Sequence, residues 1–147
     1  MKKNEDDIRK KYFCDLTRWQ SWLDVESALA LVQSEIDIIP SWAATVISKK
    51  SKISLINQNE LKQIIKDTGT GVFSLTKSLS NICGEAGKFV HWGATTQNIV
   101  DTGLLIVLKK YHSEMMIVIS EILKKLSFIS KKNSKTIMIG RTLSRHA

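Results

Sequence analysis

The stretch that decides the fold is GKFVHWGATTQNIVDTG, residues 87–103. A short glycine-containing loop here carries His91 and the hydroxyls of Thr95 and Thr96 directly onto the predicted start of a long helix. Such a helix start offers unpaired backbone N–H groups and a positive dipole end, which suit a carboxylate or a phosphate. On the residues alone, an ordinary threonine N-cap is an equally good interpretation.

The helix that follows is predicted to run from about Thr96 to Lys132. Its apolar residues repeat at near-heptad spacing, at Leu104, Leu108, Tyr111, Met115, Val118, Ile122, Leu126 and Ile129. A second apolar line contains Leu105, Met116, Ile119 and Leu123. A helix that is apolar on more than one side needs other long helices as neighbours, from the same chain or from another subunit. We interpret these side chains as core residues.

The residues before this loop are predicted to form shorter helices, so the chain is predicted to be all-α: an N-terminal helical domain plus the first long helix of a central bundle. An apolar stripe predicts a helix over 16–38, through Trp22, Val25, Leu29, Val32 and Ile36. A short helix is expected at 41–49. Asn57 and Glu60 match a capping box for the next helix, and a further helix is expected over 72–83.

Composition sets the class of protein. The chain has 147 residues, 43% of them apolar, which suits one packed domain or slightly more. No apolar run approaches the ~18 residues of a membrane span, and the polar N-terminus lacks a signal-peptide core. Cys14 and Cys83 are isolated, which fits a reducing cytosol better than a disulfide framework. We therefore predict a cytoplasmic protein with no membrane segment.

The net charge of +8 is unevenly distributed, because nine basic and two acidic residues lie from Gly103 onward. A basic segment of this kind could bind nucleic acid, face an acidic surface of a partner, or simply be solvated. Its lysines come in pairs without interleaved aromatic residues. Specific nucleic-acid binding is therefore not expected.

Three motifs occur in order along the chain. WLDVESALA at 22–30 is followed by Ile38-Ile39-Pro40, HWGATTQNIVDT stands at 91–102, and GRTLSRHA stands at 140–147. They resemble WLxVExALAxAQxxxGxIP, HxGxTSxDxxDT and GRTHxQxA, the signatures of the fumarase/aspartase (fumarate lyase) superfamily. The likeness is greatest to its adenylosuccinate lyase and 3-carboxy-cis,cis-muconate cycloisomerase branch. Three motifs in the right order are far more specific than any one of them.

The resemblance implies a mostly helical fold with a central bundle of long helices, assembled as a homotetramer. Residues 1–95 would then be the N-terminal helical domain, and 96–147 the truncated start of the bundle domain. Members cleave or form a C–N or C–O bond next to a carboxylate, often releasing fumarate. The expected partner is a small anionic carboxylate substrate, and no cofactor and no metal are expected. Each active site combines segments of three subunits.

The resemblance also assigns candidate site residues. Thr95 and Thr96 would hold a substrate carboxylate, and His91, a candidate catalytic residue, would border the same pocket; a packed, hydrogen-bonded histidine is the alternative. Arg141 would pair with a carboxylate of substrate or protein. Arg18 is a candidate anion contact or a solvated surface arginine. The candidate substrate-binding residues are thus Thr95, Thr96, Asn98, Arg141, Thr142 and Arg18.

Departures from the family pattern predict that the isolated chain is inactive. Leu143 stands where a histidine, the general acid or its partner, normally follows the Arg-Thr pair. Thr70 stands where a loop histidine is usual, and Asn98 replaces an aspartate. The later signature SSxMPxKxN, whose serine abstracts the proton next to the carboxylate, is not among these residues. We expect the N-terminal part of a lyase from a truncated, split or degenerate gene.

Two other classes of function stay open. The first is a non-catalytic helical interaction module or degenerate pseudoenzyme, which would assemble with a complete relative. The second is a basic helical nucleic-acid binder. The sequence does not identify the substrate, because the groups that choose it lie mostly in later segments of the family.

Overall fold

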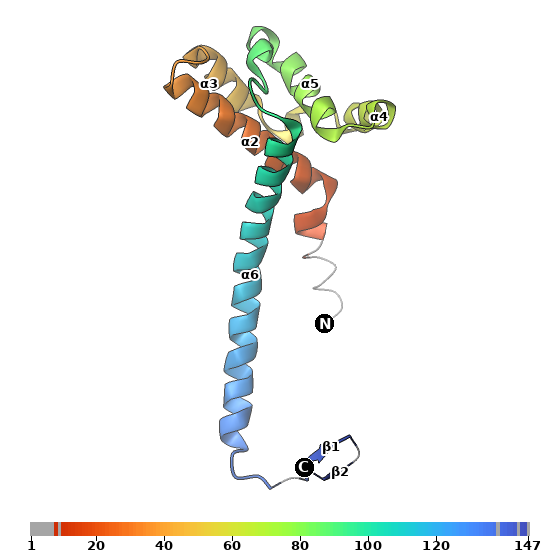
Figure 1. The fold of residues 1–147 in the computed structure, drawn as a ribbon, viewed down its shortest axis with the longest axis vertical. Helices are drawn as coiled ribbons and strands as arrows, with labels where there is room; N and C mark the ends of the chain where they lie inside the picture. Colours follow the sequence, from red (N-terminus) through yellow and green to blue (C-terminus); the bar gives the residue numbers. More distant parts are fainter. Residues whose placement is uncertain (1–7, 9, 138, 144, 147) are drawn as a thin grey trace. The chain divides into compact units, whose positions relative to one another are not determined.

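The computed structural model describes residues 8, 10–137, 139–143 and 145–146, and helices dominate them (Figure 1). The elements are α2 (Asp15–Glu35), α3 (Ser41–Lys50), η1 (Ile53–Leu55), α4 (Gln58–Thr68), α5 (Gly71–Cys83), η2 (Gly84–Phe89), α6 (Thr96–Lys132), β1 (Arg141–Thr142) and β2 (Arg145–His146). The two strands form a two-residue antiparallel ladder with Arg141 opposite His146. The fold is all-α, as the sequence predicts.

The chain divides into two compact units, residues 1–110 and residues 111–147. The first unit contains α2 to α5 and the beginning of α6, and the second contains the rest of α6 and the two strands. The expected domain boundary between residues 95 and 96 stays a prediction. Within the described part of the chain, no helix is long and apolar enough to cross a membrane.

The core of the first unit is built by the short helices. In Figure 1, α3 lies along α2, and α5 packs against α3, α4 and η2. The large apolar side chains that are fully buried come from each of the helices α2 to α6: Leu23, Ile47, Leu61, Leu75, Leu79 and Ile99. Each such side chain contributes about 1.5–3 kcal/mol by leaving water. The core therefore fixes where α6 begins.

The buried face of α2 differs from the predicted apolar stripe. Val32 and Ile36, the last two members of that stripe, are 54% and 61% exposed. The buried positions are instead Trp19, Ser21, Trp22, Leu23, Glu26, Ala30 and Gln33. The reason is tertiary: Glu26 and Gln33 bind the loop before α6. The predicted stripe was therefore right at Trp22 and wrong at its C-terminal end.

Glycine brings α6 close to α2. A Cβ atom at Gly103 would lie 2.7 Å from Cδ1 of Trp22 and 2.9 Å from Oγ of Ser21, so only glycine fits there without a shift. The residues of α6 that are buried are Ile99, Gly103 and Val107. All three belong to the first unit, and they hold the first turns of α6 against α2.

Candidate carboxylate-binding site

Thr95 and Asn98 cap the start of α6 reciprocally. The N–H and the hydroxyl of Thr95 donate to Oδ1 of Asn98 at 3.0 and 2.7 Å. The N–H of Asn98 reaches back to Oγ1 of Thr95 at 3.4 Å. This is a capping box in which asparagine occupies the usual Glu/Gln position. The expected helix-start position of Thr95 and Thr96 is therefore confirmed.

The cap separates the roles that the two threonines can have. The Thr95 hydroxyl and the Asn98 side chain are already bonded to each other. Thr96 is exposed, and its hydroxyl has no hydrogen-bond partner among the described residues. The N–H groups of Thr96 and Gln97 belong to the first turn, where an α-helix supplies no acceptor. Three donors are thus available at this helix start, and the side-chain donor comes from Thr96.

Two polar side chains of α2 hold the loop that leads into this cap. Nδ1 of His91 lies 2.6 Å from Oε1 of Glu26. The Nε2 amide of Gln33 donates to the backbone carbonyl of Trp92 at 2.7 Å. Glu26 and Gln33 lie two helical turns apart on the buried face of α2. The loop is therefore fixed at two consecutive residues by one rigid helix.

His91 adopts a backbone conformation that needs this support. Its φ is +61°, in the left-handed region, which costs a residue other than glycine on the order of 1–3 kcal/mol. Its side chain is 24% exposed. Nδ1 is bonded to Glu26, and Nε2 has no partner within the described part of the chain. His91 is therefore a packed, hydrogen-bonded histidine with one of its two ring nitrogens bonded to Glu26.

Glu26 is a buried carboxyl group with a single described partner. Its side chain is 1% exposed, and its Oε2 oxygen has no hydrogen-bond partner among the described residues. Burial raises the pKa of Glu26 above its ordinary value of 4.5, while the hydrogen bond and the charge of His91 partly offset that rise. The Glu26–His91 contact is therefore the main interaction that offsets the free-energy cost of burying this carboxyl group.

Arg18 does not join this loop. Its Nη2 atom forms an exposed ion pair with Oδ1 of Asp15 at 2.6 Å, and its guanidinium lies 5.7 Å from the centre of the Trp22 ring. It lines a cavity of about 380 Å³ together with Tyr12, Phe13, Ser21, Trp22, Val100, Leu104 and Val107. None of the residues from His91 to Thr96 lines that cavity.

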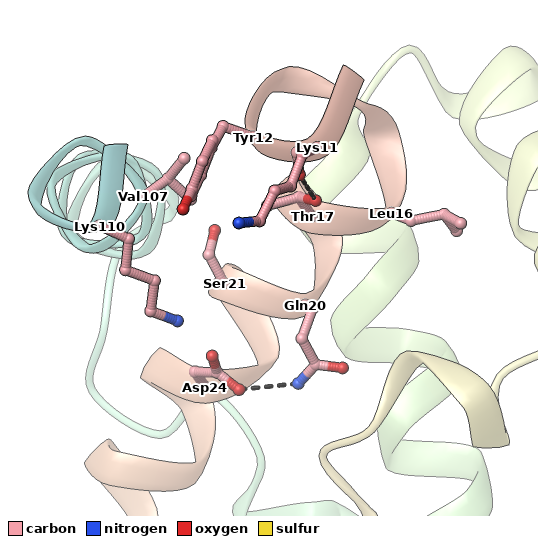
Figure 2. A pocket seen from close by; sticks show the side chains of 9 residues that line it. All are labelled: Lys11, Tyr12, Leu16, Thr17, Gln20, Ser21, Asp24, Val107 and Lys110. Atoms are coloured by element: carbon pink, nitrogen blue, oxygen red, sulfur yellow. Dashed lines mark hydrogen bonds between the residues drawn. The ribbon is translucent and has the colours of Figure 1, made fainter. Parts of the chain in front are cut away.

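A neighbouring hollow of about 360 Å³ is lined by apolar and polar side chains, and several of the polar groups form hydrogen bonds within the first unit (Figure 2). Lys11 enters it from the segment before α2 and Lys110 from α6. Gln20 donates to Asp24 at 2.7 Å, and the Thr17 hydroxyl donates to the carbonyl of Lys11 at 2.6 Å. This hollow contains none of the predicted site residues.

The second predicted substrate segment lies in the second unit, which spans residues 111–147. Arg141 and Thr142 form β1, and Thr142 is exposed. The side chain of Arg141, and Ser144 and Ala147 of the same motif, lie outside what the structure describes. Leu143 is fully exposed with a φ of +43°.

Sequence reasoning missed Glu26 and Gln33 as site residues. Both stand in the opening helix, in line with the buried Trp19, Leu23 and Ala30 at helical spacing. Two polar residues on such a face are the signal that could have found them, because a buried polar group requires a partner.

Comparison with known proteins decides the family. A family model described as "Lyase" matches residues 4–147. The chain belongs to the fumarate lyase superfamily. It is 36% identical over 129 residues to the adenylosuccinate lyase of Methanothermobacter thermautotrophicus. The aligned residues make up 87% of this chain and 29% of that protein. The superfamily expected from the three motifs is thereby confirmed.

Solved structures confirm the fold. The fumarate lyase from Mesorhizobium sp. BNC1 superposes with a TM-score of 0.89 at 31% identity, and covers 97% of this chain and 33% of that one. The 3-carboxy-cis,cis-muconate lactonizing enzyme from Pseudomonas putida gives the same TM-score and coverage at 29% identity. The chain thus spans about a third of the length of the relatives that it matches.

Proposed function

We propose that this chain supplies the carboxylate-binding start of the long helix in a lyase that eliminates across a C–N or C–O bond next to a carboxylate. The observation that carries the proposal is the capped start of α6, where the Thr96 hydroxyl and two N–H groups are without a described partner. Membership of the superfamily supports the reaction class. The adenylosuccinate lyases among its relatives make adenylosuccinate the first substrate to test.

The chemistry of the site fits a carboxylate. A carboxylate accepts several hydrogen bonds, and a helix start offers N–H groups together with a positive dipole end. The Thr96 hydroxyl adds one hydrogen bond to a charged group, a class that contributes about 1.5–3 kcal/mol. His91 stands at the head of the same loop, five residues earlier.

The groups that donate and accept protons in the reaction come from other segments of the assembled enzyme. Leu143, at the position where the family places a histidine, can neither donate nor accept a proton. We therefore propose that the chain works only when it is assembled with other segments or copies, in the cytoplasm, and that it is inactive alone. The exposed apolar side chains of α6 support assembly with further helices.

The test joins residues 1–147 to the part of the Methanothermobacter thermautotrophicus adenylosuccinate lyase that lies beyond the matched stretch. The isolated chain should give no measurable cleavage of adenylosuccinate, and the chimaera should release fumarate slowly. Leu143→His in the chimaera should raise turnover by about 10²–10⁴-fold, the usual contribution of a general acid or base. A chimaera that assembles and stays inactive with Leu143→His contradicts the proposal.

The presence of a leucine at position 143, in place of the family's histidine, favours a second candidate function, a non-catalytic assembly module. The chain would then bind subunits of a complete relative through α6 without supplying a working site. The same chimaera separates the two candidates. Assembly without activity, in both the Leu143 and the Leu143→His forms, supports the module, whereas activity in the Leu143→His form supports the lyase.

A further inference from the structure

The Glu26–His91 pair determines what the open nitrogen of His91 can do. Neutral imidazole has one N–H and one acceptor nitrogen, whereas imidazolium has two N–H groups. Nδ1 faces Glu26 at 2.6 Å, and the chemistry offered to a ligand is therefore that of Nε2. If Nε2 carries a proton it binds anions, and if it does not it is a base.

The pair can be neutral in two ways. In one, Glu26 is a carboxylate and His91 an imidazolium, so both ring nitrogens are protonated. In the other, Glu26 is a carboxylic acid that donates to Nδ1, and the single ring proton is on Nε2. In both arrangements Nε2 carries a proton, wherever the bridging proton lies.

The third arrangement leaves the pair with a net negative charge. Glu26 would be a carboxylate, His91 a neutral ring protonated at Nδ1, and Nε2 a base. This state places a charge on a side chain that is 1% exposed and whose Oε2 atom has no described partner. An uncompensated buried charge is the costliest of the three states. The raised pKa of Glu26 points the same way, because burial favours keeping a proton in the pair.

We infer that Glu26 is a positioning residue that keeps Nε2 of His91 protonated, so that His91 serves the site as an anion donor and not as a general base. This inference rests on the proposed carboxylate function. The donor sits four residues before the capping threonine of α6, in a loop that Glu26 and Gln33 both anchor. Glu26 reaches the ligand only through the ring of His91.

The protonation state of Nε2 of His91 can be measured without a ligand. Imidazole nitrogen spectra of the ¹⁵N-labelled chain at pH 7.5, with the His91 signals assigned by their loss in His91→Gln, report whether Nε2 carries a proton. His112, an exposed histidine of α6, gives an internal reference in the same spectrum. We expect a protonated Nε2 and a downfield signal from the proton between His91 and Glu26. An unprotonated Nε2 in the unmodified chain overturns the inference, and this measurement needs no variant that might fail to fold.

Two variants separate positioning from loop anchoring. Glu26→Gln should abolish the downfield bridging signal, because the carboxyl group is gone. Gln33→Met removes the other anchor of the same loop and should keep that signal, because the Glu26–His91 bond remains. A bridging signal that survives Glu26→Gln, or one lost equally in both variants, overturns the positioning role.

Fumarate then tests the proposed function separately, with fumaramide as an uncharged control of the same shape. Fumarate should shift the Nε2 signal of His91 and the amide signals of Thr96 and Gln97, and Glu26→Gln should raise its dissociation constant about tenfold. Shifts at Thr96 and Gln97 without any at His91 overturn the donor role and leave the helix-start site in place. If fumarate shifts none of these signals, the carboxylate function fails, whereas the effect of Glu26 on His91 protonation stands on the ligand-free spectra.

Discussion

The two parts of α6 carry similar apolar patterns but differ in burial. In the first unit, α6 contributes Ile99, Gly103 and Val107 to the buried residues, and Gly103 touches Trp22 of α2 closely. From Tyr111 to Lys132 none of its residues is buried, although apolar side chains continue at the same spacing. Exposed members of this second part include Met116, Val118, Ile122, Leu123, Leu126 and Ile129.

This difference shows what periodicity can and cannot predict. The spacing of apolar residues fixes which face of a helix prefers to be buried, but it does not say which segment covers that face. In the first part α2 of the same chain covers Gly103. Leu104, Leu105 and Leu108 of the same part, which the apolar pattern assigned to the core, are exposed, because the face of α6 that meets α2 carries Ile99, Gly103 and Val107 instead. In the second part the apolar side chains remain exposed, and a contiguous exposed apolar surface favours association.

The largest expected effect is on self-association through the second part of α6. We expect the chain to form oligomers at micromolar concentration, and Ile122→Glu with Leu126→Glu to weaken them. Each apolar side chain contributes about 2 kcal/mol when it is buried in an interface, so the double change should raise the dissociation constant by roughly a thousandfold. Sedimentation or light scattering over a concentration series measures it.

The matched control is Ser120→Glu with Ser127→Glu, which adds the same charge to exposed polar positions of the same helix. The serines lie about 100–160° around α6 from the two replaced apolar residues, because residues along an α-helix advance by about 100° each. The control should associate like the unmodified chain. A clean monomer of the unmodified chain up to high micromolar concentration would break the comparison between the two parts of α6.

The second prediction concerns ligand binding at the start of α6. Thr96→Val keeps the side-chain shape and removes the hydroxyl, so in the chimaera it should weaken the binding of adenylosuccinate by about 1.5–3 kcal/mol, roughly 10- to 100-fold. Thr102→Val, the same replacement at an exposed site further along the helix, is the control. Equal affinities of the two variants would remove Thr96 from the site.

The start of α6 shows why some features were predictable from the sequence. The helix was expected from about Thr96 to Lys132 and is observed over that range. Its start depends on Thr95 and Asn98, three residues apart, and its end on a polar break near Lys132. Capping chemistry of this kind is local, so it can be read from neighbouring residues.

The loop anchors were not predictable in the same way. Glu26 bonds a residue 65 positions away and Gln33 one 59 positions away. The spacing along α2 can mark both as polar residues on a buried face, but it does not identify their partners. The buried face of α2 was misjudged for the same reason, since polar side chains take positions that hydrophobicity assigns to solvent. Candidate residues from the family motif were therefore named, but the residue that sets the chemistry of His91 was not.

The third prediction concerns stability and tests the close packing of α6 against α2 at Gly103. Alanine is a better helix former than glycine by about 0.8–1.0 kcal/mol, so Gly103→Ala would stabilise an unpacked helix. Here the new methyl group would lie 2.7 Å from Cδ1 of Trp22, and overpacking costs about 1–3 kcal/mol. We expect a net loss in the free energy of unfolding, measured in urea. Ser127→Ala, at an exposed site of the second part, should change it by less than about 0.5 kcal/mol.

The smallest expected effect is a dependence of stability on pH that comes from Glu26. Because burial raises the pKa of Glu26 above 4.5, the folded chain keeps a proton that the unfolded chain releases. Stability falls as pH rises wherever the folded state binds more protons, so the contribution of Glu26 is full below 4.5 and is lost as the pH rises through the raised pKa. The difference in unfolding free energy between the unmodified chain and Glu26→Gln should therefore decrease as the pH is raised above 4.5.

Glu35→Gln, at an exposed site near the end of the same helix, removes the same charge and should not reproduce that slope. A difference that rises with pH would mean that the carboxylate form of Glu26 stabilises the fold, and that His91 compensates its charge more completely than burial penalises it.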